Sequence, residues 1–403
     1  MFESLWFSRR RAGQGTGRSQ PPHSSQARRP GRRLFLEPLE ARTLLTSYTA
    51  ATVADLIADI NAANKAGGTN TIALTAPTSS PYVLTAVDNS TDGATGLPVI
   101  ARKDALTIIG NGDTIERSTA SGAPAFRLFD VASGASLTLQ NLTLQNGLAF
   151  GSGTASEGGA IYNQGTLVLS GVTVQGNTAR GSDGVNSHAG NDASGGGVWS
   201  GGALTAQSGT LVQNNQAIGG AGASNTKDLL TSVGGNAFGG GIFAAGGMAT
   251  LTGVVVDNNV AQGGEGGSRF GQDGLAYSHG GSAFGGGLSV AAGTVNLSSS
   301  TVDNNSVAGG YGYNNLQYAE AFGGGLYVGG GTVTLCSDTV QSNSAVADPT
   351  FTSDGHGGGI YIASGATVYI DSFTVANTIS NTDAYGLNSS TANIDGTYIL
   401  QNG

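Results

Sequence analysis

Two acidic residues at matching places in consecutive repeats are the first candidates for chemistry. Asp257 lies in a Val-Val-Asp-Asn-Asn segment and Asp303 in Thr-Val-Asp-Asn-Asn. Glycoside hydrolysis needs two carboxyl groups on one face, roughly 5–10 Å apart. If the two repeats stack as neighbouring coils, these carboxyl groups approach within that range. Each acid also precedes two asparagines, and a plain turn residue in such a place needs no catalytic role.

Two short polar segments near the end of the chain resemble fragments of polygalacturonase motifs. They are Gly355-His356-Gly357 and Asn381-Thr382-Asp383. In polygalacturonases the Asn-Thr-Asp element precedes Gly-His-Gly, whereas this chain has the reverse order and lacks the Asp-Asp and Arg-Ile-Lys elements. We therefore interpret His356 as a loop residue before a glycine turn, and we assign no catalytic residue.

Lyase chemistry would need acids that hold Ca²⁺ and a base that abstracts a proton. Nine of the 17 Lys and Arg residues lie in residues 1–47, which leaves eight for the rest of the chain. None of those eight falls in a recurrent strand position near clustered acids. We predict no metal site and no cofactor, with loose Ca²⁺ binding by the loop around 263–274 as the remaining option.

A column of aromatic residues is the candidate for ligand binding. One aromatic residue follows a recurrent aliphatic position in five of six repeats, at Tyr162, Trp199, Phe243, Tyr327 and Tyr361, and Ser289 takes the place in the sixth. Alternation along a strand points these side chains away from the core, where stacked rings could contact sugar rings. The alternative is an aromatic ladder that seals the fold beneath its loops.

These residues are positioned by a phrase that occurs six times between residues 158 and 380. The phrase opens at Gly158, Gly195, Gly239, Gly285, Gly323 and Gly357. The first aliphatic column is Ile161, Val198, Ile242, Leu288, Leu326 and Ile360. The second is Leu169, Gln207, Leu251, Leu297, Leu335 and Ile370, and the third is Val174, Val212, Val256, Val302, Val340 and Val375. Five copies then place an asparagine, at Asn177, Asn215, Asn259, Asn305 and Asn343.

The repeated columns predict a parallel β-helix. Alternating β-branched residues broken by glycine indicate short strands, and one such unit buries its apolar residues only when copies stack. Seven or eight coils at the usual strand spacing would form a rod of roughly 35–40 Å. The asparagines would pass amide hydrogen bonds from coil to coil and tolerate left-handed backbone. A β-sandwich is the alternative, but sandwiches do not repeat their columns.

The region before the repeats reads as a head and a cap. Residues 1–47, rich in Arg, Pro and Ser, predict a disordered basic head, and residues 48–403 form the β-helix domain. Within 52–65, the spacing of Val53, Leu56, Ile57 and Ile60 predicts a helix that caps the rod, with Thr52 and Asp55 as its capping box and Gly67 as its end.

The segment from Leu36 to Leu45 resembles the LEPR-xLL export segment of planctomycete surface proteins. It matches at Leu36-Glu37-Pro38, Arg42 and Leu44-Leu45, with three residues inserted before the arginine. This resemblance implies targeting to the cell surface or the medium.

The Gly-Gly-Ala-Ile of residues 158–161 and its variants resemble the repeats of chlamydial polymorphic outer membrane proteins. The Val-x-x-Asn from Val174 to Asn177 and its counterparts stand where that family has Phe-x-x-Asn. The resemblance implies a right-handed parallel β-helix of the pectate-lyase-like fold, extracellular or at the cell surface, with a structural or adhesive role. The predicted partners are extracellular polysaccharides or cell-surface components, and a polysaccharide lyase or hydrolase is the alternative.

Charge and composition narrow the partners further. Residues 48–403 carry 23 acidic and eight basic residues, because three of the 26 acids and nine of the 17 bases belong to the head. An acidic body does not suit phosphate neutralisation, so no nucleic acid is expected. The single cysteine, Cys336, forms no internal disulfide, and no apolar run is long enough to span a membrane. Loops at 180–194, 218–238, 262–284, 309–322 and 348–356 should leave one side of the rod, pinned by Phe238, Phe284 and Phe322.

Overall fold

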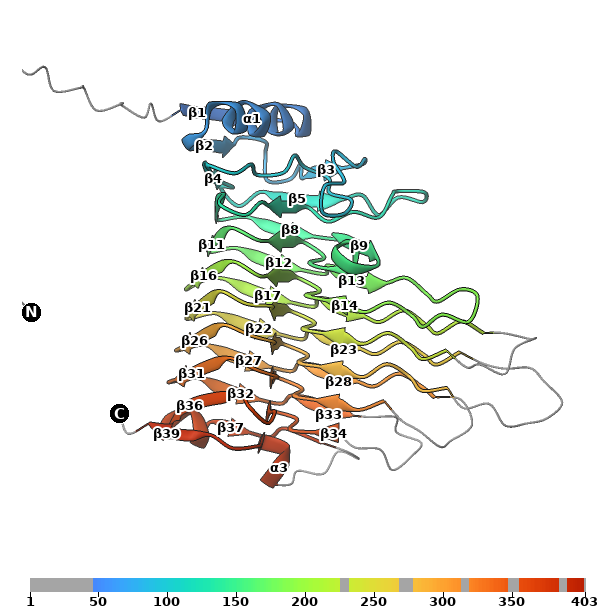
Figure 1. Ribbon diagram of the computed structural model, residues 1–403. Helices are drawn as coiled ribbons and strands as arrows, with labels where there is room; N and C mark the ends of the chain where they lie inside the picture. The colour runs from blue at the N-terminus through green and yellow to red at the C-terminus, as the bar shows by residue number, and fades with distance from the viewer. Residues whose placement is uncertain are drawn as a thin grey trace, which may run out of the picture. The chain divides into compact units, whose positions relative to one another are not determined.

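The computed structural model describes residues 46–224, 232–267, 278–312, 319–346, 355–383 and 390–401. The chain winds as a right-handed parallel β-helix, as predicted (Figure 1). All pairings between its named strands are parallel, and each coil contributes a strand to up to five sheets. The predicted head, residues 1–47, lies outside the described residues except for residues 46 and 47, which begin the first strand.

The five sheets are named A to E here. Sheet A has eleven strands: β1 (Thr46–Ala50), β2 (Gly68–Leu74), β4 (Asp104–Ile109), β7 (Ser136–Gln140), β11 (Thr166–Ser170), β16 (Ala203–Gln207), β21 (Met248–Thr252), β26 (Thr294–Ser298), β31 (Thr332–Cys336), β36 (Thr367–Asp371) and β39 (Ile399–Gln401). Sheet B has nine: β3 (Tyr82–Leu84), β5 (Thr114–Arg117), β8 (Thr143–Gln145), β12 (Thr173–Gln175), β17 (Leu211–Gln213), β22 (Val255–Asp257), β27 (Thr301–Asp303), β32 (Thr339–Gln341) and β37 (Thr378–Ile379).

Sheet C has eight strands: β6 (Phe129–Val131), β10 (Ile161–Asn163), β15 (Val198–Ser200), β20 (Ile242–Ala244), β25 (Leu288–Val290), β30 (Leu326–Val328), β35 (Ile360–Ile362) and β38 (Ile394–Asp395). Sheet D has six: β9 (Leu148–Gly151), β13 (Thr178–Gly181), β18 (Gln216–Ile218), β23 (Val260–Gln262), β28 (Ser306–Ala308) and β33 (Ser344–Val346). Sheet E has five: β14 (Ala193–Ser194), β19 (Ala237–Phe238), β24 (Ala283–Phe284), β29 (Ala321–Phe322) and β34 (Gly355–His356).

The rod is longer than the sequence predicted. Eleven strands in sheet A, at the usual spacing of about 4.8 Å, give a length on the order of 50 Å. The estimate of seven or eight coils was too low because the outer coils, such as those of β2 and β4, lack the glycine phrase that marked a repeat.

Two positions in the predicted columns are wrong. The first column holds throughout, since Ile161, Val198, Ile242 and their counterparts are register partners in sheet C. In the second column Ala206, not Gln207, pairs with Leu169 and Leu251, and Gln207 is exposed. In the third, Val340 pairs with Thr378, because Val375 lies in the short helix α2 (Ser372–Ala376).

Five of the six phrases open with three glycines, and the first opens with Gly158-Gly159-Ala160. At residues 239–241 each glycine has a separate cause. Gly239 has φ +60°, a left-handed conformation that favours glycine. A Cβ on Gly240 would lie 2.3 Å from the Val260 carbonyl oxygen, so only glycine fits. A Cβ on Gly241 would lie 3.0 Å from the Asn259 Cγ. The turn and the close approach of backbone require glycine, whereas the third position, which is Ala160 in the first phrase, requires only a small residue beside the asparagine.

The asparagine column forms a buried ladder, as predicted, and it extends further than the sequence suggested. Asn259 Nδ2 donates to Asn305 Oδ1 at 2.9 Å and to the Val212 carbonyl at 2.9 Å. The same pattern runs from Asn177 to Asn381, and Asn381 Nδ2 reaches Asn393 Oδ1 at 3.2 Å. The left-handed residue is the one before each ladder position, such as Asn258 at φ +54°, so the ladder asparagines are not the left-handed ones.

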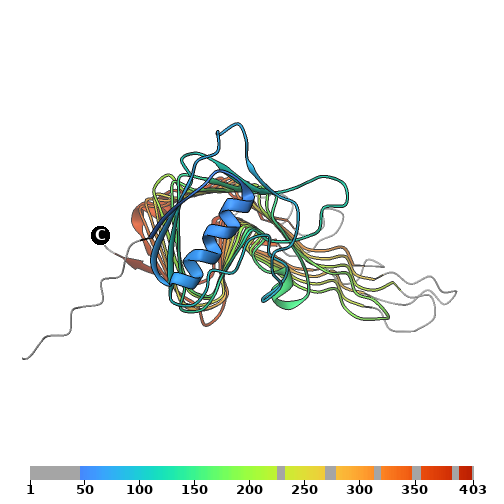
Figure 2. The ribbon, with the colours of Figure 1, turned by 90° about the horizontal axis from the view of Figure 1, so that it is seen from above.

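Helix α1 (Val53–Ala66) covers the N-terminal end of the rod, as predicted (Figure 2). Its Leu56, Ile60 and Ala63 are buried in the core. The Thr52–Asp55 capping box forms and Gly67 ends the helix at φ +62°. The opposite end carries α2, α3 (Ser390–Asn393) and the edge strand β39, with exposed apolar side chains at Phe373, Ile379, Tyr398, Ile399 and Leu400.

The loops leave one side of the rod, as predicted, where they form a flat projection between sheets D and E (Figure 2). We call this projection the fin and restrict it to the described segments 181–192, 219–224, 232–236, 263–267, 278–282, 309–312 and 319–320. Its outgoing and returning chains hydrogen-bond in a zigzag: Gly235 N donates to Gly220 O, Gly264 N to Gly235 O, and Gly281 N to Gly264 O, each at 2.8 Å. A Cβ on Gly264 would lie 1.9 Å from Gly220 O, so the fin requires glycine.

Candidate functional site

The predicted aromatic column is in register along sheet C. Tyr162 pairs with Trp199, Trp199 with Phe243, and Tyr327 with Tyr361, while Ser289 lies between Phe243 and Tyr327. Tyr162 is 2% exposed, whereas the other four rings are half-buried. Ser289 is buried, so its small side chain leaves no opening in the column.

A second aromatic ladder lies beside this column. Phe238, Phe284, Phe322 and His356 stack on one another along sheet E, with ring centroids 4.9, 5.5 and 5.4 Å apart. They meet the first column at an angle, with Phe322 and Tyr361 centroids 4.6 Å apart and tilted by 50°. The phenylalanines thus pin the loops onto the rod, as the sequence suggested.

The two ladders together form the aromatic corner, defined here as Trp199, Phe243, Tyr327, Tyr361, Phe238, Phe284, Phe322 and His356. Edge and face contacts between these rings stabilise the base of the fin. Because the rings are half-buried, part of each also faces solvent. Burial raises the pKa of the Tyr327 and Tyr361 phenols, so both hydroxyls stay protonated and can donate a hydrogen bond.

The N-terminal end of the aromatic column carries a buried charge cluster that the sequence analysis missed. Asp130 is the register partner of Tyr162, and Arg127 lies with its Cζ 4.8 Å above the Tyr162 ring. Arg127 and Asp130 are both 0% exposed. Arg127 donates to the Thr154 carbonyl, while its Nε and Nη1 and both Asp130 carboxylate oxygens have no hydrogen-bond partner.

Arg127 lies near acids but precedes strand β6, so it occupies no recurrent strand position. Burial, helped by Asp92, raises the pKa of Asp130 to about 6, and Arg127 opposes this shift. Burial also raises the pKa of Glu157 and lowers that of Arg127. Because Arg127 and Asp130 are fully enclosed, a polysaccharide cannot touch either group in this structure.

A signal for the cluster does exist in the sequence. Register places Phe126-Arg127-Leu128 where the next coil has Gly158-Gly159-Ala160. These three residues precede β6, which begins at Phe129. Large side chains fit there because the preceding coil supplies small residues, and a Cβ on Gly93 would lie 2.6 Å from Arg127 Nη2. The change from Phe-Arg-Leu to Gly-Gly-Ala therefore marks the start of the regular coils.

The predicted acid pair lies on the outer face of sheet B. Asp257 and Asp303 are direct register partners, so the coils do bring them together. Asn258 and Asn304 donate to Asp257 at 2.7 and 3.2 Å, and Gln341 donates to Asp303 at 3.2 Å. They continue a row of amides, because Gln213 donates to Gln175 and Gln175 to Gln145, each at 2.8 Å. Their contacts are those of a polar ladder.

In the two segments that resemble polygalacturonase motifs, Asn381 and His356 belong to two different ladders of the rod. Asn381 is buried in the asparagine ladder and accepts from Asn343 at 3.0 Å. His356 is the last ring of the ladder in sheet E, with its Nδ1 3.3 Å from an Asp395 carboxylate oxygen. Asn381 is therefore engaged in hydrogen bonds along the rod, and His356 is engaged in ring stacking and in its contact with Asp395.

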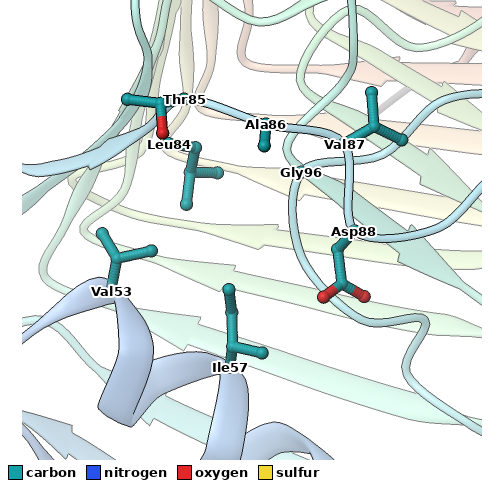
Figure 3. Close-up of a pocket in the computed structure, with 8 residues that line it drawn as sticks. All are labelled: Val53, Ile57, Leu84, Thr85, Ala86, Val87, Asp88 and Gly96. Carbon is teal, nitrogen blue, oxygen red and sulfur yellow. The ribbon is translucent and has the colours of Figure 1, made fainter.

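A hollow of about 210 Å³ lies beneath helix α1 (Figure 3). Val53 and Ile57 from the helix face Leu84 and Val87 across it, and Asp88 is its one ionisable lining residue. The hollow therefore lacks the pair of ionisable groups that general acid–base catalysis by an acid and a base would use. A larger hollow of about 340 Å³ lies where the fin meets sheet D, with an Arg180–Asp183 ion pair of 3.4 Å in its wall.

Within the described part of the chain, no three His, Cys, Asp or Glu side chains lie close enough to hold a metal ion. No helix among the described residues is long and apolar enough to cross a membrane. Comparisons with protein-family models, with curated proteins and with solved structures find no match to this chain.

Proposed function

We propose that this chain is a secreted or cell-surface β-helix protein with a structural and adhesive role, and that it binds neutral glycans at the aromatic corner. The observation that supports this most is the in-register pair of half-buried aromatic ladders beside the fin. Sugar rings present C–H faces to aromatic rings and hydroxyls to phenols, and the corner offers both. An extended glycan along the rod would meet the same kind of ring in successive coils.

The negative charge of residues 48–403 favours neutral over acidic glycans. The body carries 23 acids and eight bases, and a polyanion such as an acidic polysaccharide or a nucleic acid would be repelled. The charged side chains that act on Tyr361 at the corner, Asp395 and Glu320, are both acidic. A neutral polysaccharide therefore suits it best.

The test is binding of the purified chain to an array of neutral and acidic glycans. Tyr327→Ala with Tyr361→Ala should lower affinity for a neutral ligand by about tenfold or more, since buried ring contacts are worth about 1 kcal/mol each. Gln175→Ala, on sheet B away from the corner, is the matched control. Retained binding in the double variant would contradict the proposal, and release of shortened glycan products would favour a lyase or hydrolase instead.

The location is tested separately. Protease treatment of intact cells that express the full chain should degrade it if it is exposed at the surface. A chain that stays protected until the cells are lysed would contradict an extracellular location.

A further inference from the structure

The outer face of sheet A is rich in hydroxyl groups. Its central column, in register from strand to strand, is Ser47, Thr71, Thr107, Thr138, Val168, Thr205, Thr250, Asn296, Thr334 and Tyr369. The flanking columns add the hydroxyls of Thr49, Thr69, Ser136, Thr166, Ser170, Thr252, Thr294, Ser298, Thr332 and Thr367. Other side chains lie between them, at Ala73, Ala105, Ile109, Gln140, Ala203, Gln207, Met248 and Cys336, and Ile399 ends the central column. We call this surface the hydroxyl face. Asp371, near its C-terminal end, is the one charged side chain at the outward positions of these strands.

The hydroxyls of this face bond little to one another. Ser298 donates to Thr252 at 3.1 Å, and this is the one hydrogen bond between hydroxyls on the described strands of the face. Threonine has a stiff χ1, so each column repeats its methyl and hydroxyl in fixed places. Seen along the rod, the coils lie over one another (Figure 2).

Charge determines which surface a second copy could approach. The body carries 15 more acids than bases, the difference between 23 and eight, and like charge opposes self-association on most of its surface. The hydroxyl face lacks that barrier. A hydroxyl both donates and accepts hydrogen bonds, so a surface of Ser and Thr is complementary to itself. Self-complementarity is what a two-fold interface requires.

The size of the face also suits a pair of chains. Eleven strands at about 4.8 Å span on the order of 50 Å, and five residues of strand span about 17 Å. The product, roughly 800 Å² per copy, is about that of a standard protein–protein interface.

We propose that a second copy of this chain docks on the hydroxyl face, with the two rods antiparallel about a two-fold axis. The axis passes through β16, the sixth of the eleven strands of sheet A. Thr205, in the central column of β16, then faces Thr205 of the second copy. This surface is separate from the aromatic corner, so pairing goes beyond the proposed glycan binding and does not depend on it.

The experiment is analytical ultracentrifugation of the full chain over a wide range of concentration and NaCl. Wild type should show a monomer–dimer equilibrium that tightens as salt rises, because salt screens the repulsion between the acidic bodies. Contact between the basic head of one chain and the acidic body of another would weaken with salt, and that result overturns the proposal. A chain that stays monomeric throughout also overturns it.

Charge swaps at the axis give the sharper result. Thr205→Lys and Thr205→Glu should each weaken dimerisation by at least about tenfold, because like charges then meet across the interface. Mixing the two variants should restore a dimer. Thr301→Lys on sheet B is the matched control and should leave the dimer unchanged, with circular dichroism and melting temperature confirming that all variants fold. Dimers that tolerate Thr205→Lys, or a mixture that does not associate, overturn the two-fold arrangement.

Discussion

Two ladders of amide side chains run along this rod, and they differ chiefly in their exposure to water. The asparagine ladder is fully buried, and each Nδ2 serves both a neighbouring amide and a core carbonyl. The ladder of Gln145, Gln175 and Gln213 lies on the outer face of sheet B, half-buried, with amides paired at similar distances. Because water can replace a bond on the surface but not in the core, the same amide bond has a different value in each place.

The largest effect is expected from Asn259→Ala. The change removes the donor to Asn305 and Val212 and the acceptor for the Asn215 backbone and side chain. Several buried groups lose partners, so the free energy of unfolding should fall by about 3–5 kcal/mol in denaturant titrations. A loss below about 1 kcal/mol would show that burial does not determine how much the ladder hydrogen bonds contribute to stability.

Asp130 is a buried polar side chain whose carboxylate, unlike the ladder amides, has no hydrogen-bond partner. Its pKa is about 6 in the folded chain and 3.8 as the ordinary value, so the folded state favours the protonated form. Its contribution is fully present below pH 3.8 and is lost as the pH rises through 6, by about 3 kcal/mol. Denaturant titrations between pH 4 and pH 7 should show this loss in wild type and not in Asp130→Asn. Parallel pH profiles for the two proteins would contradict the prediction.

Gln175→Ala should have a small effect. It breaks the bonds to Gln145 and Gln213, but water can reach the groups that lose a partner. We expect a loss of about 0.5–1 kcal/mol, measured beside Asn259→Ala in the same titrations. A loss equal to that of Asn259→Ala would remove the contrast between the two ladders.

The smallest effect is expected from Gly176→Asn. Gly176 has φ +61°, and the equivalent residues of later coils are Asn214, Asn258 and Asn304 at φ 53–54°. Its Cβ would meet nothing closer than 3.9 Å, and Asn tolerates left-handed backbone. The free energy of unfolding should change by no more than about 0.5–1 kcal/mol. Marked destabilisation would indicate that the turn between sheets B and D depends on glycine itself.

Most of the fold was predictable because successive coils make the same contacts with the same kinds of residue. The first aliphatic column and the asparagine ladder were read correctly, since identical residues recur where identical contacts do. Gln207 and Val375 were misplaced where the last or irregular coils change the number of residues between strands. Counting along the phrase then selects the wrong side chain, and only the hydrogen-bonded register corrects it.

The candidate site was predictable only in part. The aromatic column and the pinning phenylalanines follow from the repeat, but their mutual tilt depends on how sheets C and E meet. The Arg127–Asp130 cluster was missed because it occupies the first irregular coil, where Arg127 replaces a glycine. The hydroxyl face was readable as an alternation of threonines, yet its continuity over eleven strands appears only with the strand order.

The common register of the coils makes the length of this molecule adjustable. Gly239 and Gly285 are equivalent, so removal of residues 240–285 would join Gly239 to Gly286 and bring Asn215 against Asn305 in place of Asn259. The asparagine ladder and the core columns then meet neighbours of the same kind, whereas Trp199 would meet Ser289 in place of Phe243. A gene encoding such a chain can gain or lose a whole coil by unequal recombination, changing its reach by one step of about 4.8 Å while keeping the core columns continuous.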